Sequence, residues 1–271
     1  MNKQIGFIGC GKMAQAIIGG ILNSNIVDKD QLIGSASSKA TIENVKKRFS
    51  IQVTMDNKQV AEQADLLFLA VKPDLHSSII EDIRQSIKSG AIIITMAAGI
   101  SLRFLEESFG REIKAVRSMP NTPSLVGEGM SAICANRLMN EADLQAVLQI
   151  FSSFGKVEVI EESLMDSIPA ISGSSPAYVY MFIEALADGG VKGGLTREQS
   201  YKLAAQAVLG AAKMVLETGK HPGELKDQVC TPGGATIEAV AELEKNGFRT
   251  AVLTAMESCV EKTKLLSNKD Y

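Results

Sequence analysis

A glycine-rich turn near the N-terminus constrains the fold of this chain more than any other feature. The apolar run Ile5–Ile8 leads into Gly9, Gly11 and Ala14, which have the spacing G-x-G-x-x-A, and a helical pattern follows. Dinucleotide binding requires this strand–turn–helix context. One glycine permits the turn, the next lets a pyrophosphate approach the backbone, and the alanine lets the helix pack near the strand. The sequence therefore predicts a dinucleotide-binding domain that opens with its first strand.

Short apolar runs and helical patterns alternate from residue 4 to residue 160. The runs are continuously apolar, which indicates strands covered on both faces, and the helical segments between them predict βαβ crossovers. These features predict an α/β fold with a doubly wound, Rossmann-type parallel sheet. The expected strands are residues 5–8, 31–34, 66–71, 91–95, 113–117, 131–134 and 157–160.

Beyond about Leu164 the strand pattern stops and helical patterns follow one another. Their faces are rich in alanine and glycine, which allows helices to approach closely. Such a helical layer has no sheet of its own and often completes its core against a second subunit, so we expect an all-helical dimerisation domain. The predicted domains are residues 1–162 and 163–271, and the expected helices are residues 176–192, 197–217, 223–229, 237–246 and 249–266.

Charge and cysteine content exclude several classes of protein. The formal net charge of −3 and the pI of 5.6 give no basic surface for nucleic acid or for an acidic membrane. The 2 histidines and 4 well-separated cysteines make no metal-ligand spacing, so no metal site is expected. No run reaches the ~20 apolar residues of a membrane span, and the N-terminus lacks the apolar core of a signal peptide. We expect a soluble cytoplasmic protein with reduced cysteines.

The segment Gly34–Lys39 follows the second expected strand and bears on the choice of cofactor. An NAD enzyme usually places Asp or Glu here to bind the ribose 2′-hydroxyl, whereas this segment has no carboxylate before Glu43. The hydroxyls of Ser37 and Ser38 and the ammonium group of Lys39 suit a 2′-phosphate instead. We therefore predict NADPH, with NADH as a weaker alternative; the other interpretation is a serine-rich solvated loop.

Two further strand ends carry small residues that suit a cofactor crevice. The 66–71 run leads into Ala70-Val71-Lys72-Pro73, and the 91–95 run into Met96-Ala97-Ala98-Gly99. Strand ends line the crevice of such sheets, and small residues there let a nicotinamide ribose lie against the backbone. Lys72 is placed to meet the cofactor or the substrate, with a solvated loop residue as the alternative.

Near the C-terminus, residues 229–237 read V-C-T-P-G-G-A-T-I between two helical patterns. The hydroxyls of Thr231 and Thr236 bracket a Pro-Gly-Gly turn whose glycines leave backbone N–H groups uncovered at the start of a helix. The partial positive charge of a helix N-terminus favours an anion, so a small carboxylate could bind there without an arginine. The alternative is a purely structural turn in which a threonine caps the helix.

Segments along nearly the whole chain resemble those of the pyrroline-5-carboxylate reductase family. No single segment is decisive, but their order and spacing are specific, above all H-P-G-E-L-K-D followed by P-G-G-A-T. The family's G-S-G-P is altered here, with Ser175 at the glycine position. The matching segments are residues 7–14, 69–73, 96–99, 119–123, 172–178, 185–192, 210–214, 221–227 and 232–236.

The resemblance implies that NADPH reduces the C5=N bond of 1-pyrroline-5-carboxylate to L-proline, the last step of proline synthesis. It also implies a helical domain that forms an intertwined homodimer, in some members assembled into a decamer. The implied cofactor residues are Ile8, Gly9, Cys10, Gly11, Lys12, Met13, Ser38, Asn57, Ala70, Val71, Lys72, Pro73, Met96, Ala97 and Ala98. The implied substrate residues are Val229, Thr231, Gly234, Ala235 and Thr236.

The reaction implied by this resemblance needs neither a metal nor a covalent intermediate, so the protein must position the imine against the cofactor. The Thr231 hydroxyl and the N–H groups of residues 234–236 would hold the carboxylate. Thr236 is the expected catalytic residue, with its hydroxyl near the ring nitrogen. Because a threonine hydroxyl is a weak acid, we expect it to orient the imine or relay a proton from water. An ammonium group would repel an iminium, which favours a cofactor-side role for Lys72.

Three other functions compete with this one. A 3-hydroxyacid dehydrogenase of the 6-phosphogluconate dehydrogenase type shares the two-part layout, but such enzymes resemble one another in a catalytic lysine that the helical segment 176–184 lacks. An F420-dependent reductase is a more distant alternative, and a non-catalytic dinucleotide sensor would not need the 229–237 loop. Glu184 and Asp188, at i,i+4 spacing, are expected to form a polar helix face or a dimer contact and not a metal site.

Overall fold

The computed structural model describes residues 1–267, which divide into two compact units. The first unit contains Met1–Ser174 and the end of the last helix from Cys259, and the second contains Ser175–Ser258. Met165 and Ile168 are buried in a core of the first unit. Compact units and sequence domains need not coincide, and the domain division after residue 162 stays a prediction.

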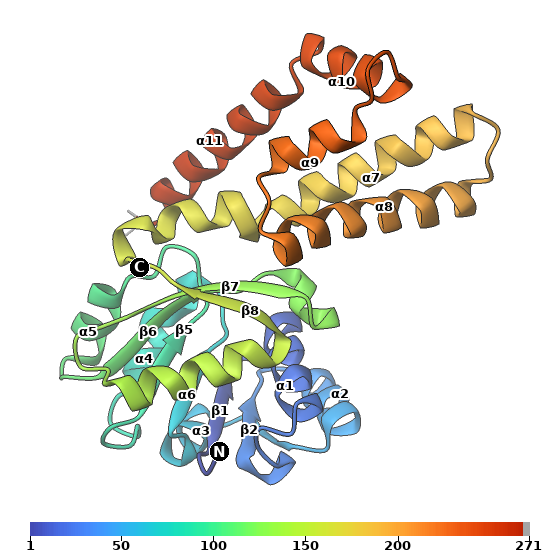
Figure 1. Cartoon of the computed structure of the whole chain (residues 1–271). Helices are drawn as coiled ribbons and strands as arrows, with labels where there is room; N and C mark the ends of the chain where they lie inside the picture. The colour runs from blue at the N-terminus through green and yellow to red at the C-terminus, as the bar shows by residue number, and fades with distance from the viewer. Residues whose placement is uncertain (268–271) are drawn as a thin grey trace. The chain divides into compact units, whose positions relative to one another are not determined.

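One sheet of eight strands forms the centre of the first unit (Figure 1). The strands are β1 (Ile5–Ile8), β2 (Leu32–Ser35), β3 (Gln52–Thr54), β4 (Leu66–Leu69), β5 (Ile92–Thr95), β6 (Lys114–Met119), β7 (Gly129–Ala135) and β8 (Gly155–Val159). Their order is β3-β2-β1-β4-β5-β6-β7-β8, and all neighbours are parallel except β6 and β7. With the helical second unit, this sheet confirms the predicted α/β class.

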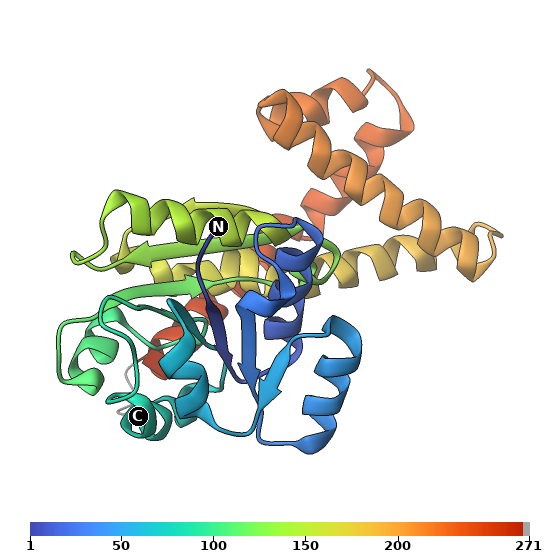
Figure 2. The same ribbon diagram turned by 90° about the horizontal axis from the view of Figure 1, so that it is seen from below.

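Helices lie on both faces of the sheet (Figure 2). They are α1 (Lys12–Asn23), α2 (Lys39–Phe49), α3 (Asn57–Gln63), α4 (His76–Ile83), α5 (Leu102–Phe109) and α6 (Glu141–Phe151). Successive side chains of β4 alternate between two cores, since Leu66 and Phe68 pack with α1, α2 and α6, whereas Leu67 and Leu69 pack with α3, α4 and α5. Both faces are therefore dry, as the continuous apolar runs predict.

Single turns of 3₁₀- or π-helix connect these elements. They are η1 (Lys29–Gln31), η2 (Pro73–Leu75), η3 (Thr122–Val126), η4 (Ser152–Phe154), η5 (Glu162–Ser167) and η6 (Pro169–Gly173). The last two follow β8.

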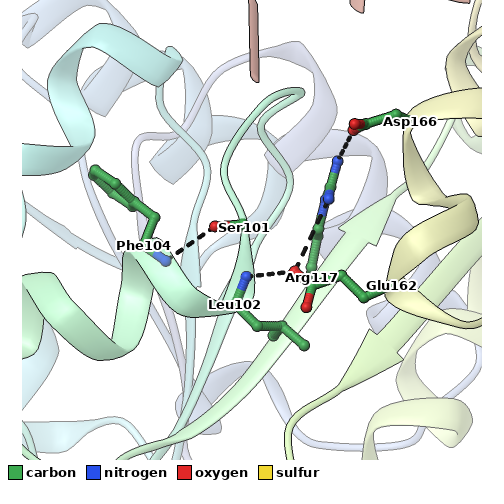
Figure 3. Close-up of polar contacts among 6 residues, drawn as sticks. All are labelled: Ser101, Leu102, Phe104, Arg117, Glu162 and Asp166. Carbon is green, nitrogen blue, oxygen red and sulfur yellow. Dashed lines mark hydrogen bonds and ion pairs between the residues drawn. The ribbon is translucent and has the colours of Figure 1, made fainter. Parts of the chain in front are cut away.

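A buried arginine anchors the segment after β8 (Figure 3). Arg117 on β6 is 7% exposed, and its Nη2 lies 2.5 Å from Oδ1 of Asp166 on η5. Oε1 of Glu162 lies 4.0 Å from Nη1 of Arg117 and accepts a hydrogen bond from the N–H of Leu102 at 2.7 Å. This carboxylate therefore sits at the N-terminus of α5, where the macrodipole favours it, beside the capping residue Ser101.

The second unit is helical. It contains α7 (Ser175–Lys192), α8 (Arg197–Thr218), α9 (Pro222–Val229), α10 (Ala235–Lys245) and the first part of α11 (Phe248–Ser267). α7 and α8 lie side by side as a hairpin (Figure 1). A capping box starts α8: Thr196 Oγ1 accepts the N–H of Gln199 at 3.2 Å, and Gln199 Oε1 accepts the N–H of Thr196 at 3.1 Å.

Little of the second unit's apolar surface is buried within the unit. Of residues 175–258, only Ala187, Ser200 and Ala204 are buried. Large apolar side chains remain exposed, with Met181 on α7 at 69% and Leu216 on α8 at 78%. An apolar surface of this extent indicates a region that another protein chain covers.

The altered family motif causes no strain where α7 begins. Ser175 is the first residue of α7. Among the described residues, the non-glycines with positive φ are Asn25 and Ser50. Ser175 stands where the resemblance noted above implies a glycine, and this backbone does not require a glycine there.

One strand, β3, was not predicted from the sequence. β3 has three residues, of which Val53 is buried and Gln52 is exposed, so it lacks the apolar run that marks the other strands. The runs at 66–71 and 91–95 are therefore the fourth and fifth strands and not the third and fourth. The other strands begin and end within two residues of the expected positions.

No helix in residues 1–267 is both long enough and apolar enough to cross a bilayer.

Candidate active site

The strand order reverses between β1 and β4, and predicted cofactor residues gather at the carboxyl ends of these two strands. In open α/β sheets the crevice at such a switch point binds the ligand. Gly9, which follows β1, donates its N–H to the carbonyl of Ser35 at 3.0 Å. Ala70, which follows β4, donates to the carbonyl of Ile8 at 2.8 Å. These two bonds hold the ends of β2, β1 and β4 together.

Gly9 fits this edge only as a glycine. Its φ is +91°, and a Cβ there would lie 2.6 Å from the carbonyl oxygen of Ala70 and 2.8 Å from Cγ1 of Val71. The bare Cα lets the two strand ends meet.

The N-terminus of α1 begins directly after this turn. Gly11 is the N-cap residue and offers no side chain to accept a hydrogen bond, and the first turn has no acidic residue. A Cβ on Gly11 would meet no atom within 4 Å, so the approach is open. The first-turn N–H groups, among them those of Lys12 and Met13, are donors that suit an anionic pyrophosphate. The turn therefore fits a dinucleotide cofactor.

Cys10 contributes to this turn through its backbone. Its side chain is buried in the core, where a Cβ on Gly34 would lie 2.5 Å from its Sγ. Burial raises the pKa of the Cys10 thiol to about 11 and that of Cys134 to about 12. Both thiols are thus protonated at neutral pH and are not nucleophiles.

The residues predicted to bind a 2′-phosphate lie after β2. Ser37, Ser38 and Lys39 are exposed, and Ser38 caps α2. Lys39 occupies the first turn of α2, where the macrodipole disfavours a cation, so a neighbouring anion would compensate for its position. Asn57 begins α3, and its Oδ1 accepts a hydrogen bond from the Ser35 hydroxyl at 2.7 Å. This bond orients the Asn57 amide so that its NH₂ group can donate elsewhere.

The loops after β4 and β5 hold the rest of the predicted cofactor residues. Ala70, Val71 and Pro73 are half-buried, Lys72 is exposed, Met96 and Ala98 are half-buried, and Ala97 is buried. Both loops leave the same edge of the sheet, because β4 and β5 are parallel neighbours.

Three residues of this region escaped the sequence analysis as site candidates: Ser35, His76 and Thr95. His76 is fully buried between the two loops and contacts Lys72 and Thr95. The available signals were slight, since Thr95 is the polar end of an isoleucine run and His76 follows Lys72 by four residues.

The predicted substrate residues lie in the second unit, in the loop between α9 and α10. Val229 ends α9 and is 64% exposed. The carbonyl of Thr231 accepts the N–H of Gly234 at 3.0 Å. Pro232 at the second position and Gly233 at the third, with φ +68°, match a type II turn. A Cβ on Gly234 would lie 2.3 Å from the Thr231 hydroxyl, so this hydroxyl lies directly over the start of α10.

A glycine, and not a threonine, occupies the N-cap of α10. Gly234 is the N-cap residue, and no side chain caps the helix. Ala235 and Thr236 are the first two helical residues, and Thr236 is half-buried. The alternative in which a threonine caps this helix is therefore wrong. The first-turn N–H groups keep their capacity to bind an anion.

Asp188 has a charge partner on the neighbouring helix. Its Oδ1 lies 2.5 Å from Nη1 of Arg197 on α8. No group of three or more His, Cys, Asp or Glu side chains in residues 1–267 is placed to hold a metal ion.

Two family models match the chain in different parts. The model described as "Pyrroline-5-carboxylate reductase dimerisation" matches residues 162–266. The model described as "NADP oxidoreductase coenzyme F420-dependent" matches residues 4–99, which include β1 to β5.

Individual relatives are similar over almost the whole chain. The pyrroline-5-carboxylate reductase of Escherichia coli (strain K12) is 48% identical over 267 residues, which cover 98% of this chain and 99% of the relative. That of Arabidopsis thaliana is 38% identical over 264 residues, which cover 97% and 95%. The crystal structure of Plasmodium falciparum pyrroline carboxylate reductase with NADP bound superposes with a TM-score of 0.89 at 39% identity, covering 98% of this chain and 99% of that chain.

Proposed function

The chain belongs to the pyrroline-5-carboxylate reductase family. On this premise we propose which residues bind the cofactor, which bind the substrate and which take part in proton transfer. The protein is an oxidoreductase of proline biosynthesis that reduces 1-pyrroline-5-carboxylate to L-proline with NADPH. The observation that carries this function is similarity along both units, with 48% identity over 98% of the chain.

We assign the cofactor to the carboxyl ends of β1, β2, β4 and β5. NADPH, when bound, supplies the hydride that C5 of the cyclic imine accepts. The N–H groups that follow Gly11 hold the pyrophosphate, and Ser37, Ser38 and Lys39 hold the 2′-phosphate. Asn57 donates its amide NH₂ to the adenosine half, because Ser35 fixes the amide oxygen. The loops after β4 and β5 shape the space for the nicotinamide half.

We assign the substrate to the loop between α9 and α10. The Thr231 hydroxyl and the N–H groups of residues 234–236 bind the carboxylate, which needs no arginine because the helix N-terminus supplies partial positive charge. This assignment rests on the uncapped start of α10 and on the place of the Thr231 hydroxyl beside Gly234. Positioning of this kind lowers the activation free energy, because it raises the effective concentration of the two reactants. The effect is on the order of 7–11 kcal/mol at best.

We assign the proton side of the reaction to Thr236. Its hydroxyl hydrogen-bonds the ring nitrogen and relays from water the one proton that this nitrogen takes up, which gives the protonated imine that accepts the hydride. A threonine hydroxyl is too weak an acid to act alone, so its contribution is orientation and relay. Lys72 keeps a cofactor-side role, because its ammonium group would repel the protonated imine.

Lys39 should set the preference for NADPH over NADH. Replacement of Lys39 with alanine should raise KM for NADPH about fivefold, because one charge-assisted hydrogen bond to the phosphate is lost, and should leave KM for NADH unchanged. Steady-state kinetics with both cofactors measure the two constants. Lys47, exposed near the other end of the same helix, gives the matched control Lys47→Ala. Equal changes with both cofactors would remove Lys39 from the phosphate site.

The experiment that tests the function is NADPH oxidation with DL-1-pyrroline-5-carboxylate, followed by identification of the product. We expect rapid turnover to proline, slower turnover with NADH, and no reduction of NADP⁺ by a 3-hydroxyacid. Tight binding of NADPH without turnover of the imine would instead favour a dinucleotide sensor. Reduction of NADP⁺ by the 3-hydroxyacid would favour a dehydrogenase.

The helical region is a dimerisation domain. We propose that it forms the intertwined homodimer of the family, and that dimers assemble further into a decamer. The exposed apolar side chains of α7 and α8 support a subunit interface. Light scattering separates a dimer of the 28.9 kDa chain from a decamer.

We further propose that the enzyme works in the cytoplasm, in keeping with the free thiols of Cys10, Cys134, Cys230 and Cys259.

A further inference from the structure

A buried histidine lies between the two loops assigned to the nicotinamide half of the cofactor. His76, the first residue of α4, is 0% exposed. Its Nδ1 lies 3.1 Å from the carbonyl oxygen of Lys72, and its Nε2 lies 3.0 Å from the hydroxyl oxygen of Thr95. A buried polar side chain costs free energy unless each polar atom is bonded, and both ring nitrogens of His76 are.

The partners determine where the ring proton lies. A carbonyl oxygen only accepts hydrogen bonds, so Nδ1 of His76 carries the proton and donates to Lys72. Burial lowers the pKa of His76, which keeps the ring neutral at pH 7. In the neutral ring Nε2 must accept, so the Thr95 hydroxyl donates to it. The same hydroxyl oxygen accepts the N–H of Ala97 at 3.3 Å.

Three hydrogen bonds thus run in one direction from one loop to the other, through Ala97, Thr95, His76 and Lys72. Two of these residues are also bonded to residues outside this chain of bonds. The Lys72 carbonyl also accepts the N–H of Leu75 at 3.1 Å. The Thr95 carbonyl accepts the hydroxyl of Ser118 on β6 at 2.7 Å.

These three hydrogen bonds form a bridge between the two loops, and this bridge begins where strand pairing ends. Leu69 and Thr95 are the last paired residues of β4 and β5, so backbone pairing between the strands does not extend into the loops that follow. The sheet is held together without the bridge. What the His76–Thr95 pair adds is a fixed separation between Lys72 in one loop and Ala97 in the other.

We propose that His76 and Thr95 are positioning residues that set the width of the nicotinamide site by joining the loops after β4 and β5. The proposal rests on the assignment of residues 70–73 and 96–98 to the cofactor. Neither side chain needs to touch the reacting atoms. Loss of the bridge should let the two loops separate. NADPH must then order them when it binds, and the entropy lost in doing so weakens binding.

The test uses two substitutions of Thr95 in the full-length protein. Thr95→Val removes the hydroxyl at nearly constant shape, and Thr95→Ser keeps it. Kd for NADPH, measured by titration calorimetry, should rise about tenfold in Thr95→Val and less than twofold in Thr95→Ser. Kd for adenosine 2′,5′-bisphosphate, which occupies only the adenosine half, should stay unchanged in both.

His76 supplies an independent variant. His76→Asn can keep the donor to Lys72 and loses the acceptor for Thr95, so it should weaken NADPH binding as Thr95→Val does. The double variant should bind NADPH no more weakly than either single variant, because both remove the same link. If Kd rises equally for NADPH and for the bisphosphate, or if only Tm falls, the pair is merely structural and the proposal fails.

Gly9→Ala separates this failure from failure of the cofactor site itself. Its Cβ would lie 2.6 Å from the carbonyl oxygen of Ala70, so both NADPH and the bisphosphate should bind more weakly. Weakening in Gly9→Ala without an effect in Thr95→Val overturns the positioning role alone. Unchanged binding in Gly9→Ala overturns the cofactor assignment on which that role rests.

Discussion

Replacement of Thr236 with alanine should lower kcat/KM for 1-pyrroline-5-carboxylate about 10- to 100-fold, equivalent to about 1.4–2.8 kcal/mol of transition-state stabilisation. The hydroxyl is lost where proton relay to the ring nitrogen is assigned. Helix α10 should be unaffected, because its N-cap is Gly234 and alanine is a better helix former than threonine. Steady-state kinetics at saturating NADPH, with Tm recorded on the same samples, measure both effects.

Thr236→Ser is the matched control for this variant. Serine retains the hydroxyl and should keep most of the activity, whereas valine retains the shape without the hydroxyl and should behave like alanine. A Thr236→Ala enzyme with unchanged kcat/KM would remove this residue from the chemistry. The same loss in the serine and alanine variants would point to packing of the methyl group.

Replacement of Arg117 with methionine should destabilise the first unit by about 3 kcal/mol, because it removes the cation from a largely buried ion pair. Asp166 and Glu162 would keep their charges beside a site that is 7% exposed. The side chain of Asp166 is 29% exposed, which places the expected effect near the lower end for buried pairs. Chemical denaturation in urea measures the change.

Arg103 provides the surface comparison on the same side of the sheet. It forms an i,i+4 pair with Glu107, and its side chain is 85% exposed. Arg103→Met should therefore leave the urea midpoint of unfolding almost unchanged. Equal losses in the two arginine variants would mean that burial of the Arg117 network contributes nothing.

The first unit could be predicted closely because its strands are apolar on both sides and its glycines have fixed spacing. Ile5–Ile8 is the first strand as expected, and the fingerprint turn follows it. β3 was missed since a three-residue edge strand with one buried side chain has no pattern to detect. The antiparallel pairing of β6 and β7 could not be predicted either, because the length of an apolar run does not indicate the direction of its strand.

Candidate site residues could be named from the sequence where the expected function depends on the backbone. Gly9 and the 231–234 turn are marked in the sequence because few residues other than glycine and proline adopt those conformations. Ser35, His76 and Thr95 could not be named from the sequence, because their hydrogen bonds depend on partners that folding brings close. The hydroxyl of Ser35 meets Asn57 from 22 positions away, and His76 meets Thr95 from 19 positions away.

Because residues 175–258 bury so few of their own side chains, we expect folding of the second unit to be coupled to association of two chains in a single equilibrium. The apparent free energy of unfolding then depends on how much protein is present. A tenfold dilution lowers it by about 1.4 kcal/mol for a two-chain assembly. A cell that makes little of this enzyme therefore works with a less stable form of it. A polar substitution at Met181 or Leu216, outside both assigned sites, could reduce flux to proline simply by depleting paired chains.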